Sequence, residues 1–263
     1  MKKTLITLAV AASAVVSGAA MAAAGWKQSG LGGTVELSGK LTPADHVTPW
    51  EVKTGDPKTG LDAFIKKGAR YVEIEVKGES IPVLGIRTHD KGPFQGTAGI
   101  SPQIDFRGAL GAFETGSWAP LTMDVKSGDQ KIGKVVVNLR AAAVYSYTDD
   151  LGAKQQRPMF ASASGNGFYG GLPSSADKAF SDPLAFAQYH FPEASANYNN
   201  QGIEKVESEK AWNTFGYTRA KFSAFYASAI PHGQVFRITL DNPVSDSEKI
   251  QWKASLPVVV SYM

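Results

Sequence analysis

Near the C-terminus the chain reads Trp252-Lys253-Ala254-Ser255-Leu256-Pro257-Val258-Val259-Val260-Ser261-Tyr262. Every second residue is apolar: Trp252, Ala254, Leu256, Val258, Val260 and Tyr262. A period of two is typical of a β-strand that buries one face. Pro257 lies on the other face and has no N–H group, which predicts an edge strand or a bulge. An edge strand with a long apolar face needs a cover, because uncovered it pairs with other chains.

A second alternating stretch lies near the other end: Leu31-Gly32-Gly33-Thr34-Val35-Glu36-Leu37-Ser38-Gly39-Lys40-Leu41. One face carries Leu31, Gly33, Val35, Leu37, Gly39 and Leu41, and the other face is polar. Burial of the four large apolar side chains contributes about 6 to 12 kcal/mol before the costs of ordering the strand. The two glycines weaken an ordinary strand, but they suit one that another backbone or a filled pocket approaches closely.

The two stretches allow two arrangements. In the first, residues 31–41 pair with residues 252–262 of the same chain and close a self-contained sandwich. In the second, residues 252–262 form one wall of an open groove, which is filled first by a chaperone and then by residues 31–41 of another molecule through β-strand addition. The alternation alone favours neither arrangement.

Residues 1–22 have the three parts of a secretory signal peptide. Lys2 and Lys3 supply the positive start, an apolar run follows, and Ala20-Met21-Ala22 is an A-x-A cleavage signal. The apolar run is too short to span a bilayer. We therefore expect an exported protein, whose mature form keeps 241 of the 263 residues once the first 22 are removed.

Composition excludes several functions. The signal holds two of the 27 basic residues, so the mature chain has 25 basic against 24 acidic residues, and no basic stretch is interleaved with aromatics as in a nucleic-acid groove. There is no cysteine, which excludes thiol catalysis and thiolate metal sites. We expect no metal site and no cofactor, because none of the four histidines has metal-site spacing. These are His46, His89, His190 and His232.

No hydrolase or phosphate-loop motif is present, so the sequence does not indicate an enzyme. Two carboxylates that meet in a cleft stay possible, although no pair is singled out.

Short alternating strands recur between glycine, proline, asparagine and aspartate residues. They cover residues 70–76, 134–139 and 235–240. This rhythm predicts an all-β protein, with an antiparallel sandwich preferred to a barrel. Residues 221–230 fit either a strand or a helix.

Residues 149–218 interrupt the rhythm with a polar, aromatic and glycine-rich composition. Asp182 and Pro183 suit a helix N-cap and first position, which predicts a helix over residues 184–191 that Pro192 ends. A weaker helix is predicted over residues 203–212. We interpret residues 149–218 as an insertion that carries short helices on a β-framework.

Aromatic residues gather in this insertion: Phe160, Phe168, Tyr169, Tyr189 and Tyr198. They can stack on a sugar ring or fill a small satellite core, and the second role is favoured because scattered aromatics usually pack. As possible glycan contacts we single out Phe160, Phe168 and Tyr169.

Four segments carry a resemblance to a known family. They are Trp26-Lys27-Gln28-Ser29-Gly30 with the stretch that follows it to Thr42, Ile81-Pro82-Val83-Leu84-Gly85-Ile86-Arg87-Thr88, Phe168-Tyr169-Gly170-Gly171-Leu172, and the stretch at residues 252–262. In this order, over almost the whole mature chain, they resemble the FaeG family of chaperone-usher fimbrial subunits.

The resemblance implies an immunoglobulin-like sandwich with an incomplete sheet that a donor strand completes. It implies that residues 31–41 are the donor strand, within an N-terminal extension of residues 23–42, and that residues 43–263 are the fimbrial domain. Residues 252–262 would be the groove edge that a periplasmic chaperone binds. Subunits of this type are polymerised at an outer-membrane usher into a fimbrium on the cell surface.

The resemblance leaves two functions open. In the family's adhesive major subunit, a helix-bearing insertion carries the host-glycan site. Here the insertion departs from that subunit apart from residues 168–172. A structural fimbrial subunit and a glycan-binding adhesin are therefore both compatible with the sequence.

Overall fold

The structure is a computed structural model that describes residues 39, 47–245 and 249–263. The chain divides into two compact units, Met1–Asp45 and His46–Met263. The predicted signal peptide, residues 1–22, lies outside the described residues. The predicted donor strand, residues 31–41, also lies outside them except for Gly39, which is exposed and belongs to no strand.

The described part of His46–Met263 contains twelve strands and two short helices. The strands are β1 (Trp50–Thr54), β2 (Tyr71–Glu75), β3 (Ile81–Thr88), β4 (Phe94–Gln95), β5 (Pro102–Asp105), β6 (Trp118–Ser127), β7 (Gln130–Asp149), β8 (Lys154–Pro158), β9 (Ala220–Ile230), β10 (Val235–Leu240), β11 (Lys253–Ala254) and β12 (Val259–Tyr262). The helices are α1 (Pro183–His190) and α2 (Pro192–Ser195).

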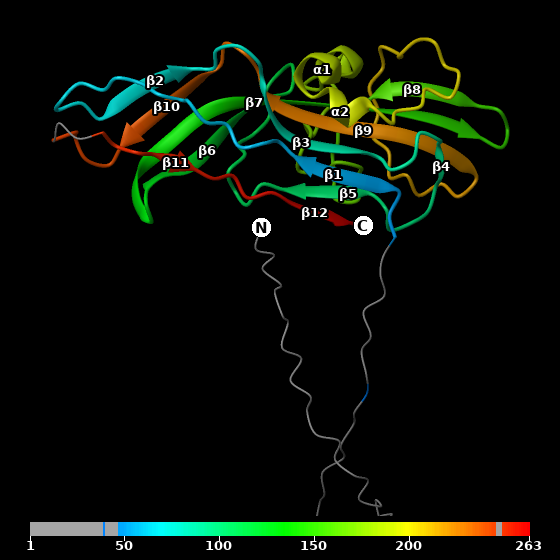
Figure 1. Cartoon of the computed structure of the whole chain (residues 1–263). Helices are drawn as coiled ribbons and strands as arrows, with labels where there is room; N and C mark the ends of the chain where they lie inside the picture. Colours follow the sequence, from blue (N-terminus) through cyan, green and yellow to red (C-terminus); the bar gives the residue numbers. More distant parts are fainter. Residues whose placement is uncertain (1–38, 40–46, 246–248) are drawn as a thin grey trace, which may run out of the picture. The chain divides into compact units, whose positions relative to one another are not determined.

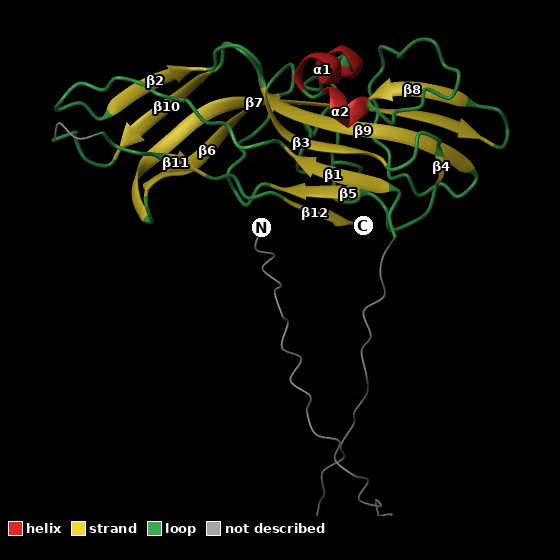
Figure 2. Ribbon diagram, viewed as in Figure 1, coloured by secondary structure: helices red, strands yellow, loops and turns green. Residues whose placement is uncertain are grey.

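Ten strands form one large antiparallel sheet around β7. The main order is β1-β3-β9-β7-β10-β2, with β4 on β9, with β6 and β8 on β7, and with β11 on β6. The 20-residue strand β7 pairs with β10 over residues 133–136 and with β9 over residues 140–149. A second sheet consists of β5 and β12. The antiparallel, sandwich-like all-β fold predicted from the strand rhythm is confirmed (Figure 2).

Strand β9 is buried on both faces, which settles the open assignment of residues 221–230 as a strand. On one face Phe222, Ala224 and Tyr226 enter the main core, which also includes Ile104 of β5. On the other face Phe225, Ala227 and Ala229 pack under α1 and α2 in a second apolar cluster. Figure 1 shows both helices beside β7 and β9. A strand covered on both faces loses its simple alternation, which explains why its periodicity was ambiguous.

The predicted helix after Asp182 is confirmed, with bounds shifted by one residue. Pro183 is the first residue of α1, and the Asp182 carboxylate accepts a hydrogen bond from the backbone N of Ala185 at 3.1 Å. Pro192 ends α1, as predicted, and then starts α2.

The prediction of a helix over residues 203–212 is wrong, because no helix forms there. The backbone N–H groups of Glu207 and Ala211 donate instead to the carbonyls of Gln156 and Pro158 in β8, at 2.8 and 3.0 Å. Pairing with β8 satisfies donors that a helix would have used internally.

The Asp182 cap gives a stability prediction. Asp182→Ala removes the acceptor for the first turn of α1 and is expected to lower the free energy of unfolding by about 1 kcal/mol. Urea denaturation of the purified chain measures the change. Asp62→Ala is the control, since Asp62 is exposed and has no hydrogen bond or ion pair within the described residues. Equal effects of the two substitutions would contradict a capping role.

Candidate functional site

The C-terminal stretch, residues 252–262, forms two short strands instead of one. β11 pairs with β6 in the large sheet, whereas β12 pairs with β5 in the small sheet. Residues 255–258, which include Pro257, belong to neither strand. In the part of the chain that the structure describes, each strand has a neighbour on one side only (Figure 1), so both are edges, as the proline predicted.

The predicted alternation is present at every position of this stretch. The five residues between the apolar ones are exposed, and the apolar side chains are half-buried against the main core. The half-buried side chains are Trp252, Ala254, Leu256, Val258, Val260 and Tyr262. The core therefore covers one side of this row and leaves part of each side chain open.

The backbone of β12 also has an open side. Ser101 and Met263 exchange two backbone hydrogen bonds, at 3.0 and 3.1 Å. In an antiparallel ladder, such hydrogen-bonded pairs alternate with pairs whose backbone groups point the other way. The N–H and C=O groups of Val260 and Tyr262 therefore point away from β5, toward an edge beside which no strand lies among the described residues.

A segment without secondary structure, residues 56–66, lies against the start of the C-terminal stretch. Nε1 of Trp252 donates a hydrogen bond to the carbonyl of Leu61 at 3.3 Å. Leu61 and Ile65 are half-buried against the main core. The backbone N–H groups of this segment donate to no group within the described part of the chain. A second length of backbone whose N–H groups have no partner among the described residues thus accompanies the open edge.

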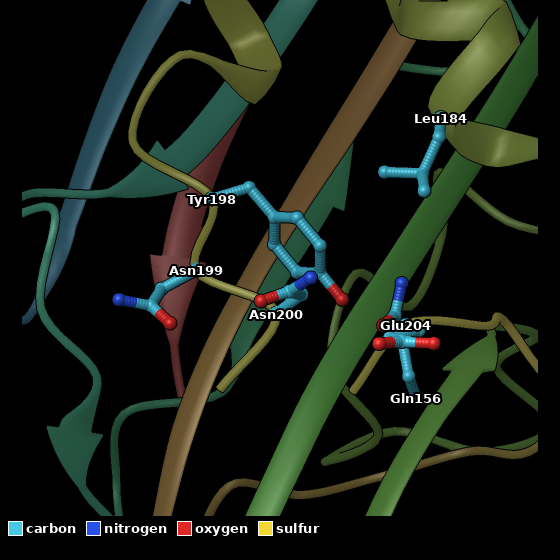
Figure 3. A pocket seen from close by; sticks show the side chains of 6 residues that line it. All are labelled: Gln156, Leu184, Tyr198, Asn199, Asn200 and Glu204. Carbon is cyan, nitrogen blue, oxygen red and sulfur yellow. The ribbon is translucent and has the colours of Figure 1, made fainter. Parts of the chain in front are cut away.

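The insertion contains a separate pocket of about 470 Å³. Figure 3 shows its lining side chains, which come from β8, from α1 and from the loop after α2, with Tyr198 directed toward Gln156 and Glu204. The lining residues are Gln156, Leu184, Tyr198, Asn199, Asn200 and Glu204.

This pocket is lined by both hydrogen-bond acceptors and hydrogen-bond donors. Gln156 is only 2% exposed, and its Oε1 atom has no hydrogen-bond partner. Burial raises the pKa of Tyr198 well above its usual range, so its hydroxyl stays protonated. Glu204 is exposed and forms no ion pair with any described residue. A ligand that both donates and accepts hydrogen bonds, such as a polyhydroxylated one, matches this lining.

The three predicted glycan contacts lie elsewhere. Phe168 is completely buried in the main core, where its ring centroid is 5.6 Å from that of Trp50 and 5.7 Å from that of Tyr226. It therefore presents no surface to a sugar. Tyr169 is 39% exposed and Phe160 is half-buried, so for these two residues the glycan role stays a prediction.

Sequence reasoning missed most of the pocket. Gln156, Leu184 and Glu204 belong to three separate elements that only the tertiary fold brings together. The polar run at residues 199–201 was visible in the sequence, but such runs are common in loops.

The described residues contain neither a metal-binding cluster nor a membrane-spanning helix. No group of three or more His, Asp or Glu side chains there is arranged to hold a metal ion. No helix there has the length and apolar character needed to cross a membrane.

Comparison with known proteins identifies the family. The family model described as "Fimbrial, major and minor subunit" matches residues 1–263. The K88 fimbrial protein AC of Escherichia coli is 30% identical over 292 residues, with all of both chains covered. The K88 fimbrial protein AD and the F41 fimbrial protein of the same organism are 31% and 27% identical, again over the full length of both chains. The chain belongs to this family of K88-type fimbrial subunits, as its resemblance to FaeG predicted.

Two neighbouring valines test the description of the C-terminal edge. Val260→Ser removes an apolar side chain from the core face of β12 and is expected to lower the free energy of unfolding by about 1 kcal/mol. Val259→Ser alters the exposed face of the same strand and is expected to change the free energy of unfolding by less than about 0.5 kcal/mol. Chemical denaturation of the two variants measures the difference. A larger loss for Val259→Ser would mean that the faces are assigned the wrong way round.

Proposed function

We propose that this chain is a structural subunit of an adhesive bacterial fimbria, exported by the chaperone-usher route and polymerised by donor-strand exchange. One observation carries the proposal: residues 252–262 combine a half-buried apolar row with unpaired backbone groups on the same edge. An incoming β-strand satisfies both needs together, since its backbone pairs with the edge while its side chains cover the row.

Residues 31–41 have the properties required of that incoming strand. They match the C-terminal stretch in length and in apolar period. Leu31, Val35, Leu37 and Leu41 can cover half-buried side chains on the acceptor, while Gly33 and Gly39 allow close approach between backbones. The donor comes from the neighbouring subunit, so each subunit completes the sheet of the next.

The open edge also accounts for the expected partners. Before assembly, an uncovered apolar edge pairs with other copies and aggregates, so a periplasmic chaperone must cover it. The signal peptide predicted at residues 1–22 directs the chain to that compartment. The relatives are named as fimbrial proteins, which supports neighbouring fimbrial subunits as partners and a cell-surface fimbrium as the final location.

Deletion of residues 23–42 tests the donor assignment. We expect the truncated chain to stay bound to its chaperone but not to polymerise, because the acceptor edge is intact while the donor is missing. Co-purification with the chaperone and electron microscopy of the cell surface measure the two properties. A truncated chain that still formed fibres would overturn the assignment.

A matched pair of point variants sharpens this test. Val35→Asp introduces a charge on the apolar face of the donor and is expected to reduce fibre yield at least about tenfold, because a carboxylate would have to be buried. Glu36→Asp changes the adjacent polar face and is expected to leave the yield unchanged. Comparable losses in both variants would show that the alternation does not direct insertion.

A second function, binding of a host glycan, is favoured by the pocket in the insertion. Its buried, unpartnered Gln156 Oε1 atom and the nearby Glu204 carboxylate can accept hydrogen bonds from sugar hydroxyls. Leu184 and the Tyr198 ring supply apolar surface beside them. A subunit with this pocket would be an adhesin as well as a building block.

A glycan array probed with donor-complemented monomer tests this second function. If the pocket binds a glycan, Gln156→Leu should weaken binding about tenfold, since it removes an acceptor. Gln155→Leu is the matched control, because Gln155 is the adjacent residue of β8 and does not line the pocket. Absence of reproducible binding by the unsubstituted monomer would leave the structural role alone.

A further inference from the structure

Strand β12 is linked to residues 165–171 through β5. β12 pairs with β5, and on its other side β5 contacts residues 168–169 of the insertion. The backbone N of Ile104 donates to the carbonyl of Tyr169 at 2.8 Å, and the backbone N of Phe168 donates to the carbonyl of Pro102 at 2.7 Å. β5 therefore lies between β12 and the insertion, bonded to both.

The Gln103 side chain links the same parts. It is 8% exposed, and its Nε2 donates to the carbonyls of Asn166 at 3.0 Å and of Ser101 at 3.2 Å. Its Oε1 accepts from the backbone N of Gly165 at 3.0 Å. Ser101 is the residue that pairs with Met263. One buried amide thus connects the insertion to the backbone that holds the end of the chain.

The insertion approaches β5 so closely that only glycine fits. Gly170 has a φ of +84°, and a Cβ atom there would lie 2.0 Å from the carbonyl oxygen of Ile104. A Cβ atom on Gly171 would lie 2.5 Å from the Ile104 side chain. Any other residue at position 170 must push β5 away or adopt a strained backbone.

The insertion also contacts the last residue of the chain directly. Ser164 Oγ lies 3.2 Å from Met263 Sδ. The Ser101 hydroxyl donates to the carbonyl of Thr214, near the end of the insertion. These two contacts therefore join residues 164 and 214 to Met263 and to its backbone partner Ser101.

We propose that the turn at residues 165–171 is a positioning element for strand acceptance, which sets the location of β5 and, through it, of β12. This inference rests on the proposed function, because it assigns a role in the edge that receives the donor strand. It gives the segment Phe168-Tyr169-Gly170-Gly171-Leu172 a task in assembly.

Gly170→Ala tests the proposal against a matched glycine. Gly202 also lies in the insertion with a positive φ, +74°, but a Cβ atom there would meet nothing within 4 Å. We expect a labelled peptide of residues 31–41 to dissociate from the Gly170→Ala chain about tenfold faster than from the unsubstituted chain. The Gly202→Ala chain should release the peptide at the unsubstituted rate. Equal rates for Gly170→Ala and the unsubstituted chain would overturn the proposal.

A second control separates positioning from general destabilisation. At Gly133, where β7 meets β10, a Cβ atom would lie 2.3 Å from the carbonyl oxygen of Thr239. Gly133→Ala should lower overall stability yet leave peptide dissociation and hydrogen exchange at the Met263 amide unchanged. Gly170→Ala should accelerate exchange at Met263 while the amides shared by β7 and β9 stay protected. If Gly133→Ala released the peptide as fast as Gly170→Ala does, the effect of Gly170→Ala would be general destabilisation, and the proposed positioning role would be wrong.

The positioning role of the turn and the proposed strand donation can fail separately. If the unsubstituted chain binds no peptide, strand donation fails, but exchange at Met263 still decides whether the turn holds β5 and β12. If Gly170→Ala does not fold, Gln103→Leu repeats the test, since it removes the amide bonds while it keeps a side chain of similar size. An unchanged Met263 exchange rate in the variant that folds would refute the inference.

Discussion

Four backbone pairs between β12 and β5 hold the end of this chain, and the described residues provide no strand on the other side of that ladder. This open edge leaves two requirements unmet. The half-buried side chains of Val260 and Tyr262 need a cover, and any cover that excludes water must also replace the hydrogen bonds that water makes to the backbone of these residues. A strand meets both needs along its whole length, because its backbone forms a regular ladder of hydrogen bonds while its side chains cover the apolar row. Completion of the fold and assembly of the fibre are therefore the same event in the account proposed here.

Patterns in the sequence predicted the structural features that depend only on neighbouring residues. The half-burial of every second residue from Trp252 onward follows from the period of a strand, and the start of α1 follows from Asp182 and Pro183. Division of the C-terminal stretch between two sheets was not predictable, because it depends on the positions of β6 and β5. The helix expected over residues 203–212 failed for a similar reason, since β8 supplies partners that only the fold brings near.

The insertion combines features that the sequence could not separate. Phe168 was a candidate for sugar stacking because it lies in a polar, glycine-rich stretch with other aromatic residues, yet it is buried in the main core against Trp50. The pocket, in contrast, is assembled from residues far apart in the chain, such as Gln156 and Glu204. One part of residues 149–218 thus bonds to β5, and another part lines a pocket with hydrogen-bonding groups.

Hydrogen exchange at single amides of β12 tests the central claim most directly. The mature chain would be compared with and without a peptide of residues 31–41. Strand acceptance predicts that the peptide protects the amides of Val260 and Tyr262, which point to the open edge, while the amide of Met263, already bonded to Ser101, changes little. Val260 and Tyr262 amides that exchange equally fast with the peptide bound would contradict the claim that this edge receives the donor strand.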